Sequence, residues 1–85
     1  MPEIARLFGI VVKMYYRDHP PPHFHAFHGE ENVMLDLCGE VLSGRFPPGS
    51  LMLLRNWVRE HQAELLENWH FARAKKPMKR IAPWR

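Results

Sequence analysis

The sequence predicts an α+β fold: an antiparallel meander of three to four strands packed on a C-terminal helix or helix pair. Two observations carry this prediction. Apolar and polar residues alternate with a period of two in the first half of the chain, whereas from residue 51 to 75 apolar residues recur every three or four positions. The prolines at 47 and 48, followed by Gly49 and Ser50, separate the two patterns. Strand patterns followed by helix patterns are typical of α+β domains.

The first half is expected to form the sheet, within residues 1–46. Residues 1–9 lead into it. The predicted strands are 10–17, 23–28, 33–38 and, less regularly, 41–46, where Gly44 weakens the pattern. The short polar stretches between them are typical of tight turns. Because one edge strand of such a sheet is exposed, a homo-oligomer or a partner chain is compatible with it.

The register between the second and third strands follows from their apolar residues. Phe24 and Ala26 must share the core face with Leu35, so a slip by one residue is excluded. A two-residue loop at Glu30 and Glu31 places His25 opposite Asp36. A slip by two residues remains open, and it places His23 opposite Asp36 instead.

Residues 47–76 are expected to be helical, with Ser50 as the N-cap. The apolar stripe fits one long helix or two shorter helices with a break near His61. Two helices are favoured, because a small sheet cannot cover so long a helix. Within the stripe His61 is interpreted as a hydrogen-bonded core histidine, and the tryptophans at 57 and 69 as core residues. In the basic tail, residues 77–85, Ile81 and Trp84 either dock on the domain or stay mobile.

Composition bounds the classes of protein. A chain of 85 residues with 46% hydrophobic and 25% charged residues fits one globular domain, residues 1–85. The single cysteine, Cys38, excludes an internal disulfide and fits the cytoplasm. No apolar run has the length of a membrane span, and the first residues do not resemble a signal peptide. The net charge of +3 permits an anionic partner.

Four of the six histidines lie between His19 and His28, around three prolines. On the second strand His23 and His25 point to the same side, so both can reach one metal ion, with Asp36 as a third ligand. Zinc or another divalent metal is the cofactor that this reading implies. The competing interpretation is a pair of solvent-exposed, hydrogen-bonded histidines with no ion.

The same residues also suit acid–base chemistry. Asp36 beside His25 would stabilise the imidazolium and raise the pKa of His25. A small ribonuclease-like domain could then use His23 or His25 for proton transfer, while Lys13 or Arg17 holds the phosphate. The competing interpretation is a structural ion pair across the two strands, which looks the same in sequence.

A third reading is binding without chemistry. The face expected to carry the two histidines also carries basic and aromatic residues, as do many nucleic-acid-binding surfaces. The binding residues predicted on these grounds are Lys13, Tyr15, Arg17, His23 and His25, and Trp84 is predicted to contact a protein partner. The tail adds further positive charge at Lys75, Lys76, Lys79, Arg80 and Arg85.

The string Pro21-Pro22-His23-Phe24-His25-Ala26 resembles the signature of a family of small bacterial proteins, domain of unknown function 4160. Further matching pieces are Met1-Pro2-Glu3-Ile4, Phe8-Gly9-Ile10, Met14-Tyr15-Tyr16, Asp18 and Leu65-Leu66-Glu67-Asn68-Trp69. The chain departs from the family at His19, commonly Asn there, and at an additional Pro20. The resemblance implies a single small domain, often encoded beside a second one in toxin–antitoxin-like pairs. It supplies no catalytic residues.

The resulting functional expectation is a small cytoplasmic interaction module. It is one half of a two-component, toxin–antitoxin-like pair. Its partner is a protein encoded by a neighbouring gene, and nucleic acid is a second candidate partner. The alternative is a small histidine-dependent ribonuclease-like or metal-binding enzyme that uses His23, His25 and Asp36.

Overall fold

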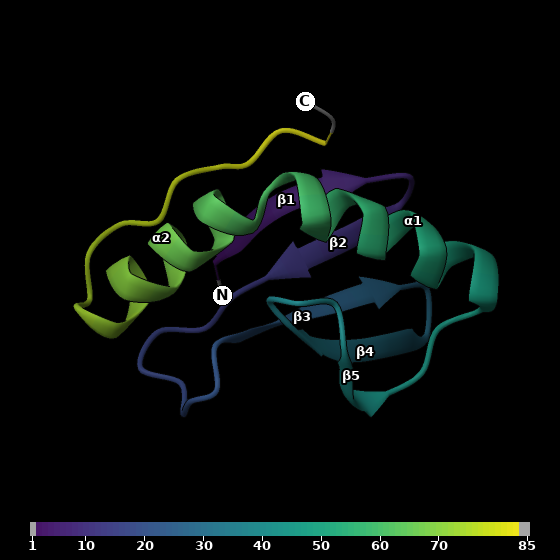
Figure 1. Cartoon of the computed structure of the whole chain (residues 1–85), viewed down its shortest axis with the longest axis horizontal. Coiled ribbons are helices and arrows are strands. Elements are labelled where there is room, and N and C mark those ends of the chain that lie inside the picture. The colour runs from purple at the N-terminus through teal and green to yellow at the C-terminus, as the bar shows by residue number, and fades with distance from the viewer. Residues whose placement is uncertain (1, 84–85) are drawn as a thin grey trace.

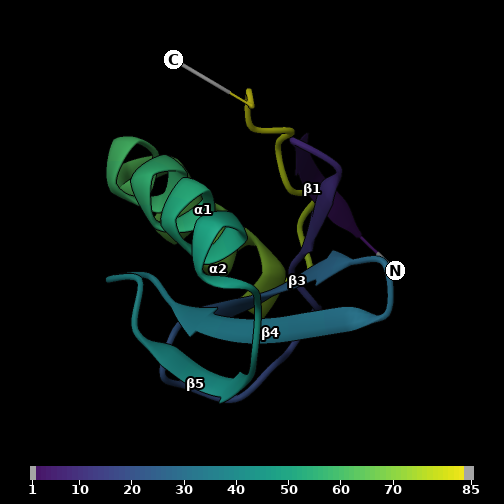
Figure 2. The same ribbon diagram turned by 90° about the vertical axis from the view of Figure 1, so that its right-hand side faces the viewer.

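The computed structural model describes residues 2–83, and its architecture is α+β as the sequence predicts. Five strands form one antiparallel sheet in the order β1-β2-β3-β4-β5, each paired with the next along the chain (Figure 1). The strands are β1 (Glu3–Leu7), β2 (Ile10–Lys13), β3 (His23–His28), β4 (Glu31–Asp36) and β5 (Val41–Gly44), followed by α1 (Pro48–Glu60) and α2 (Gln62–Arg73). Both helices lie on the same side of the sheet (Figure 2).

Strand β1 is the element that the sequence pattern missed, and it raises the strand count to five. Its pairing with β2 shifts register between Glu3 and Ala5. As a result Ile4 and Ala5 are buried side by side, with 2% and 0% of their surfaces exposed. Such an irregularity removes the alternation of apolar and polar residues by which a strand is found in a sequence.

The favoured register between β3 and β4 is wrong, and the one slipped by two residues is observed. His23 lies opposite Asp36 and His25 opposite Met34. The two-residue turn is Gly29 and Glu30, with Gly29 at φ +60°, a left-handed conformation that glycine adopts at little cost. A slip by two keeps each side chain on its face of the sheet, which is why the apolar pattern could not distinguish the two registers.

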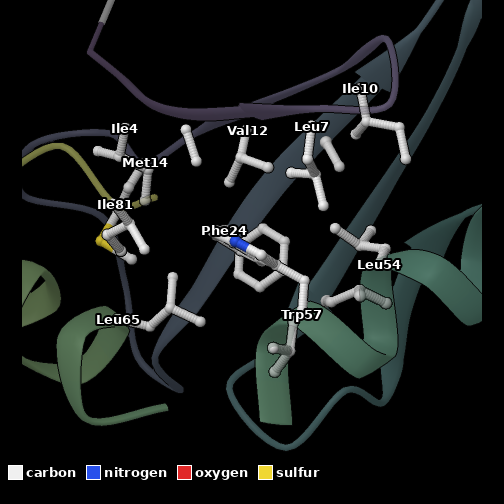
Figure 3. Packing of buried hydrophobic residues seen from close by; sticks show 14 of the residues in the cluster. Ile4, Leu7, Ile10, Val12, Met14, Phe24, Leu54, Trp57, Leu65 and Ile81 are labelled. Atoms are coloured by element: carbon white, nitrogen blue, oxygen red, sulfur yellow. The ribbon is translucent and has the colours of Figure 1, made fainter. Parts of the chain in front are cut away.

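The core lies between the sheet and the two helices. Phe24 of β3 is fully buried at its centre, and the Trp57 ring meets it edge to face with 6.2 Å between the ring centroids (Figure 3). The helical region is two helices, as favoured, and the break is at His61. The expected N-cap at Ser50 is wrong: Pro47 occupies that position and the helix begins at Pro48, whose missing N–H needs no partner there. His61 is buried and bonded to the Glu64 carboxylate, so the core-histidine interpretation is confirmed.

The described part of the tail docks on the domain. The Ile81 side chain is buried, and its backbone N–H donates to the Ile4 carbonyl of β1 at 2.8 Å. The Trp57 indole donates to the Ala82 carbonyl at 2.8 Å, which ties the tail to α1 as well. Trp84 lies outside the described residues. Over residues 2–83, no helix is long and apolar enough to span a bilayer.

Gly44 is expected to be the glycine least tolerant of substitution. Its φ is +78°, and a Cβ there would lie 2.4 Å from the Asn32 carbonyl oxygen on β4. Gly44→Ala should therefore lower the free energy of unfolding by more than about 2 kcal/mol, measured by urea denaturation with tryptophan fluorescence.

The matched control is Gly49→Ala in the first turn of α1. A Cβ at Gly49 would meet nothing within 4 Å. Alanine is the better helix former, so stability should be unchanged or should rise by up to about 1 kcal/mol. Equal losses in the two variants would contradict the assignment of Gly44 as the strained position.

Candidate functional site: a histidine–aspartate cluster beside an open sheet face

Three polar side chains, one directly before and two within the histidine- and proline-rich residues 19–28, converge at one end of the sheet. The loop that joins β2 to β3 passes through Arg17 at φ +60° and a cis Pro20–Pro21 peptide bond. It brings Asp18 Oδ2 to 2.8 Å from Nε2 of His23 and 3.7 Å from Nε2 of His25. One carboxylate oxygen thus lies near both rings, and we call Asp18, His23 and His25 the histidine–aspartate cluster.

The last turns of α2 hold this loop in place. The Arg17 N–H donates to the Ala72 carbonyl at 3.3 Å, and the Arg73 guanidinium donates to the Asp18 carbonyl. The Trp69 ring packs on His23 with 5.3 Å between their centroids. His23 is consequently 6% exposed although it belongs to the sheet face opposite the helices. Trp69, predicted only as a core residue, therefore also shapes the cluster.

Burial and hydrogen bonding act in opposite directions on the pKa values of the cluster residues. Burial raises the pKa of Asp18, but the His19 backbone N–H and the His23 ring together outweigh it, so the net pKa lies below the ordinary value. For His25, burial and the neighbouring charge of His23 lower the pKa, and Asp18 only partly offsets them. At neutral pH the carboxyl of Asp18 is therefore ionised and the ring of His25 neutral.

Asp36, the predicted third member of the site, is not part of it. Its carboxylate oxygen accepts the backbone N–H groups of Cys38 at 2.8 Å and Glu40 at 2.9 Å, an arrangement that closes the turn between β4 and β5. The predicted His25–Asp36 pair is thus wrong, and so is the expected direction of the pKa of His25, which falls instead of rising.

The sheet face opposite the helices carries an aromatic and basic surface. The Tyr15 ring lies 4.7 Å from that of His25, and the His25 and Phe27 rings are nearly parallel at 6.5 Å. The Lys13 ammonium sits 5.2 Å over Phe27. All four side chains are partly exposed. We call Lys13, Tyr15, His25 and Phe27 the open face; it adjoins the cluster through His25.

The predicted binding residue Arg17, the other two histidines of residues 19–28 and the basic tail lie apart from this arrangement. His19 and Arg17 are in the loop, and His28 points to the other face, where its ring lies 6.3 Å from that of Phe46. The positive charge of the tail is partly paired. Arg80 binds Glu3 at 2.7 Å, and Lys79 lies 3.6 Å from Glu67.

A family model described as "Domain of unknown function (DUF4160)" matches residues 9–70. The chain belongs to this family. The match to the DUF4160 model runs from the residue before β2 well into α2, so it contains every member of the cluster and of the open face. No curated protein and no solved structure matches the chain.

Chemically, the cluster of this DUF4160 domain can do two things. Two imidazole nitrogens and a carboxylate oxygen, all within 4.8 Å of one another, can hold a cation. The same groups can move a proton, since a carboxylate orients one histidine while the second stays neutral. The open face beside them offers rings and an ammonium group to a ligand.

Asp18 is the cluster residue that the pattern reasoning did not assign to the site. In the structure it lies in the loop directly after the turn residues Tyr16 and Arg17. The available signal is its position five residues before His23 with a proline turn between them, since such a turn folds the chain back on itself. The conformation of a loop, unlike that of a strand, leaves no periodic pattern in the sequence, so the approach of Asp18 to His23 could not be predicted in that way.

We expect an NMR titration of the His25 ring protons to give a midpoint below that of an ordinary histidine. His23→Gln should raise this midpoint, because it removes a neighbouring positive charge that disfavours protonation of His25. Asp36→Asn should leave it unchanged, because Asp36 binds backbone N–H groups. A midpoint that moves in Asp36→Asn but not in His23→Gln would contradict this arrangement.

The sign of the stability effect follows from the same shifts. Both Asp18 and His25 have a folded pKa below the unfolded one. Their contributions are therefore present above the unfolded pKa and are lost as the pH falls through the folded value. The contribution of His25 to folding stability is lost as the pH falls through and below the usual pKa range of histidine. The contribution of Asp18 is lost at more acidic pH.

Proposed function

We propose that this protein is a small binding module, one half of a cytoplasmic toxin–antitoxin-like pair, and that its open face is the contact surface. The observation that supports this most directly is the one-sided cover of the sheet. The helices bury the core face, whereas Lys13, Tyr15, His25 and Phe27 remain partly exposed on the other. Partly exposed aromatic side chains on a rigid sheet are typical anchors in binding surfaces.

The composition of the open face defines a suitable partner. Its rings supply apolar area with little loss of side-chain freedom, and Lys13 and the net charge of +3 favour an acidic surface. The first candidate partner is the protein encoded by the neighbouring gene, as the family resemblance suggests. Single-stranded nucleic acid is the second, since bases stack on rings while ammonium groups pair with phosphates.

Phe27→Ala should weaken binding to the neighbouring gene product by at least about tenfold, because it removes the ring that stacks on His25 and lies under the Lys13 ammonium. The measurement is co-purification followed by titration calorimetry of the isolated pair. A fluorescent single-stranded RNA, followed by anisotropy at two salt concentrations, tests the nucleic-acid partner in parallel.

Phe8→Ala is the matched control. Phe8 is 65% exposed in the β1–β2 turn and lines a hollow of about 190 Å³ beside α1, away from the open face. Its substitution should leave both affinities unchanged. Loss of binding in Phe8→Ala with full binding in Phe27→Ala would move the contact surface to that hollow and overturn the proposal.

Histidine-dependent cleavage of RNA is a second candidate function, favoured by one observation. His23 is hydrogen-bonded to a carboxylate, and His25 lies beside it with a ring that is neutral at neutral pH, the state of a general base. Lys13 lies opposite His25 on the neighbouring strand β2, so its ammonium group can reach a phosphate bound on that face.

Incubation of the purified chain with RNA, with and without chelator, tests this candidate. Cleavage should fall by at least about 100-fold in His25→Ala and be unchanged in His70→Ala, an exposed histidine of α2. Equal cleavage by both variants would show that the cluster does not carry the activity.

A further inference from the structure

Both ring nitrogens of His23 face hydrogen-bond acceptors. Nδ1 lies 2.7 Å from the Pro21 carbonyl oxygen, and Nε2 lies 2.8 Å from Asp18 Oδ2. A neutral imidazole carries one proton and can satisfy only one of these two oxygens. The ring is 6% exposed, so water does not resolve the conflict. The contact between Nε2 and Asp18 Oδ2 therefore needs either a further proton shared by the two atoms or a bound cation between them.

The surroundings of Nε2 favour the cation. His25 Nε2 lies 3.7 Å from the same Asp18 oxygen, too far for a hydrogen bond. Ligand atoms around a tetrahedral zinc ion lie about 3.4 Å apart, given metal–ligand distances near 2.1 Å. The separations in the cluster, from 2.8 Å up to 4.8 Å, bracket that value. Nε2 of His23 is within hydrogen-bond distance of Asp18 Oδ2, whereas Nε2 of His25 faces the same oxygen without a hydrogen bond to it, so the three donor atoms converge on one point.

We propose that Asp18, His23 and His25 bind one divalent metal ion, either zinc or a transition metal with similar ligand preferences. Two imidazoles and one carboxylate suit zinc and its neighbours, whereas magnesium and calcium prefer oxygen ligands throughout. Three protein ligands leave a fourth position for water or a ligand.

The second contact of each ligand fits this role. The Pro21 carbonyl accepts the Nδ1–H of His23, which fixes the tautomer with Nε2 free for the metal. The other Asp18 oxygen accepts the His19 backbone N–H at 2.9 Å, which orients the carboxylate. Trp69 and Tyr15 pack against the two rings and restrict their rotation. Such outer contacts are what a preformed metal site requires.

The site differs from the one that the sequence suggests. There the third ligand is Asp36, opposite a histidine on the neighbouring strand; here it is Asp18, from the loop that precedes the strand. The proposal is also independent of the proposed function, because an ion at this site is compatible with a binding module or with an enzyme.

The test uses the full chain, freed of metal with a chelator. Titration with Co²⁺ should give the visible absorption of a low-symmetry nitrogen–oxygen site, saturating at one ion per chain, and Zn²⁺ should displace it. Calorimetry with Zn²⁺ should show affinity weakened at least about 100-fold in Asp18→Asn and in His25→Ala. His25 is partly exposed, so His25→Ala is expected to remain folded, and circular dichroism checks this for both variants.

His70→Ala is the control, because this exposed histidine lies outside the cluster and should not affect zinc affinity. In NMR spectra, substoichiometric Zn²⁺ should shift the ring signals of His23 and His25 and leave those of His70 in place. The proposal would be overturned if the unaltered chain bound zinc no more tightly than Asp18→Asn does, or if the titration showed no saturable step. Either result would mean that a proton, not a metal ion, lies between His23 Nε2 and Asp18. Loss of partner binding in Phe27→Ala tests the open face separately and does not depend on this result.

Discussion

The core face of the sheet is buried beneath two short helices, while its other face has no helix over it in the described part of the chain. This one-sided cover assigns opposite roles to neighbouring residues of β3. Phe24 and Ala26 are fully buried under the helices, whereas His25 and Phe27 stay partly exposed. Because successive side chains of a strand point to opposite faces, the polar and aromatic residues of the open face directly follow core residues in the sequence.

His23 is the exception to that alternation, and it explains the architecture of the site. It shares a face with His25, yet it is buried because α2 extends to the end of the sheet and Trp69 packs on it. The contacts of Ala72 and Arg73 with the preceding loop come from the same turns of the helix. The cluster is therefore held jointly by the loop, the strand and α2, so its geometry depends on how the helix is docked.

Periodic patterns in the sequence were sufficient to predict the fold class and the faces of the strands but not the strand ends, since the strand predicted over 10–17 ends at Lys13. The sequence predicted the α+β class, the helix pair with its break at His61, and the faces of Phe24 and His25. It failed at β1, where a register shift buries Ile4 and Ala5 together, and at the β3–β4 register, where a slip by two leaves every face unchanged. Asp18 was missed as a site residue for a related reason: its approach to His23 is set by loop torsions and contacts with α2, which leave no periodic trace.

The docking of the tail makes the two edges of the sheet unequal. At β1, the Ile81 N–H already occupies the Ile4 carbonyl and Arg80 binds Glu3. At β5, all four residues are exposed, Val41 and Leu42 among them. Over the described residues, an added strand would therefore compete with the tail at β1, whereas it would meet no such contact of the tail at β5. If two copies paired through β5, each would present outward the β1 edge on which its own tail is docked, and further strand pairing there would have to displace that tail.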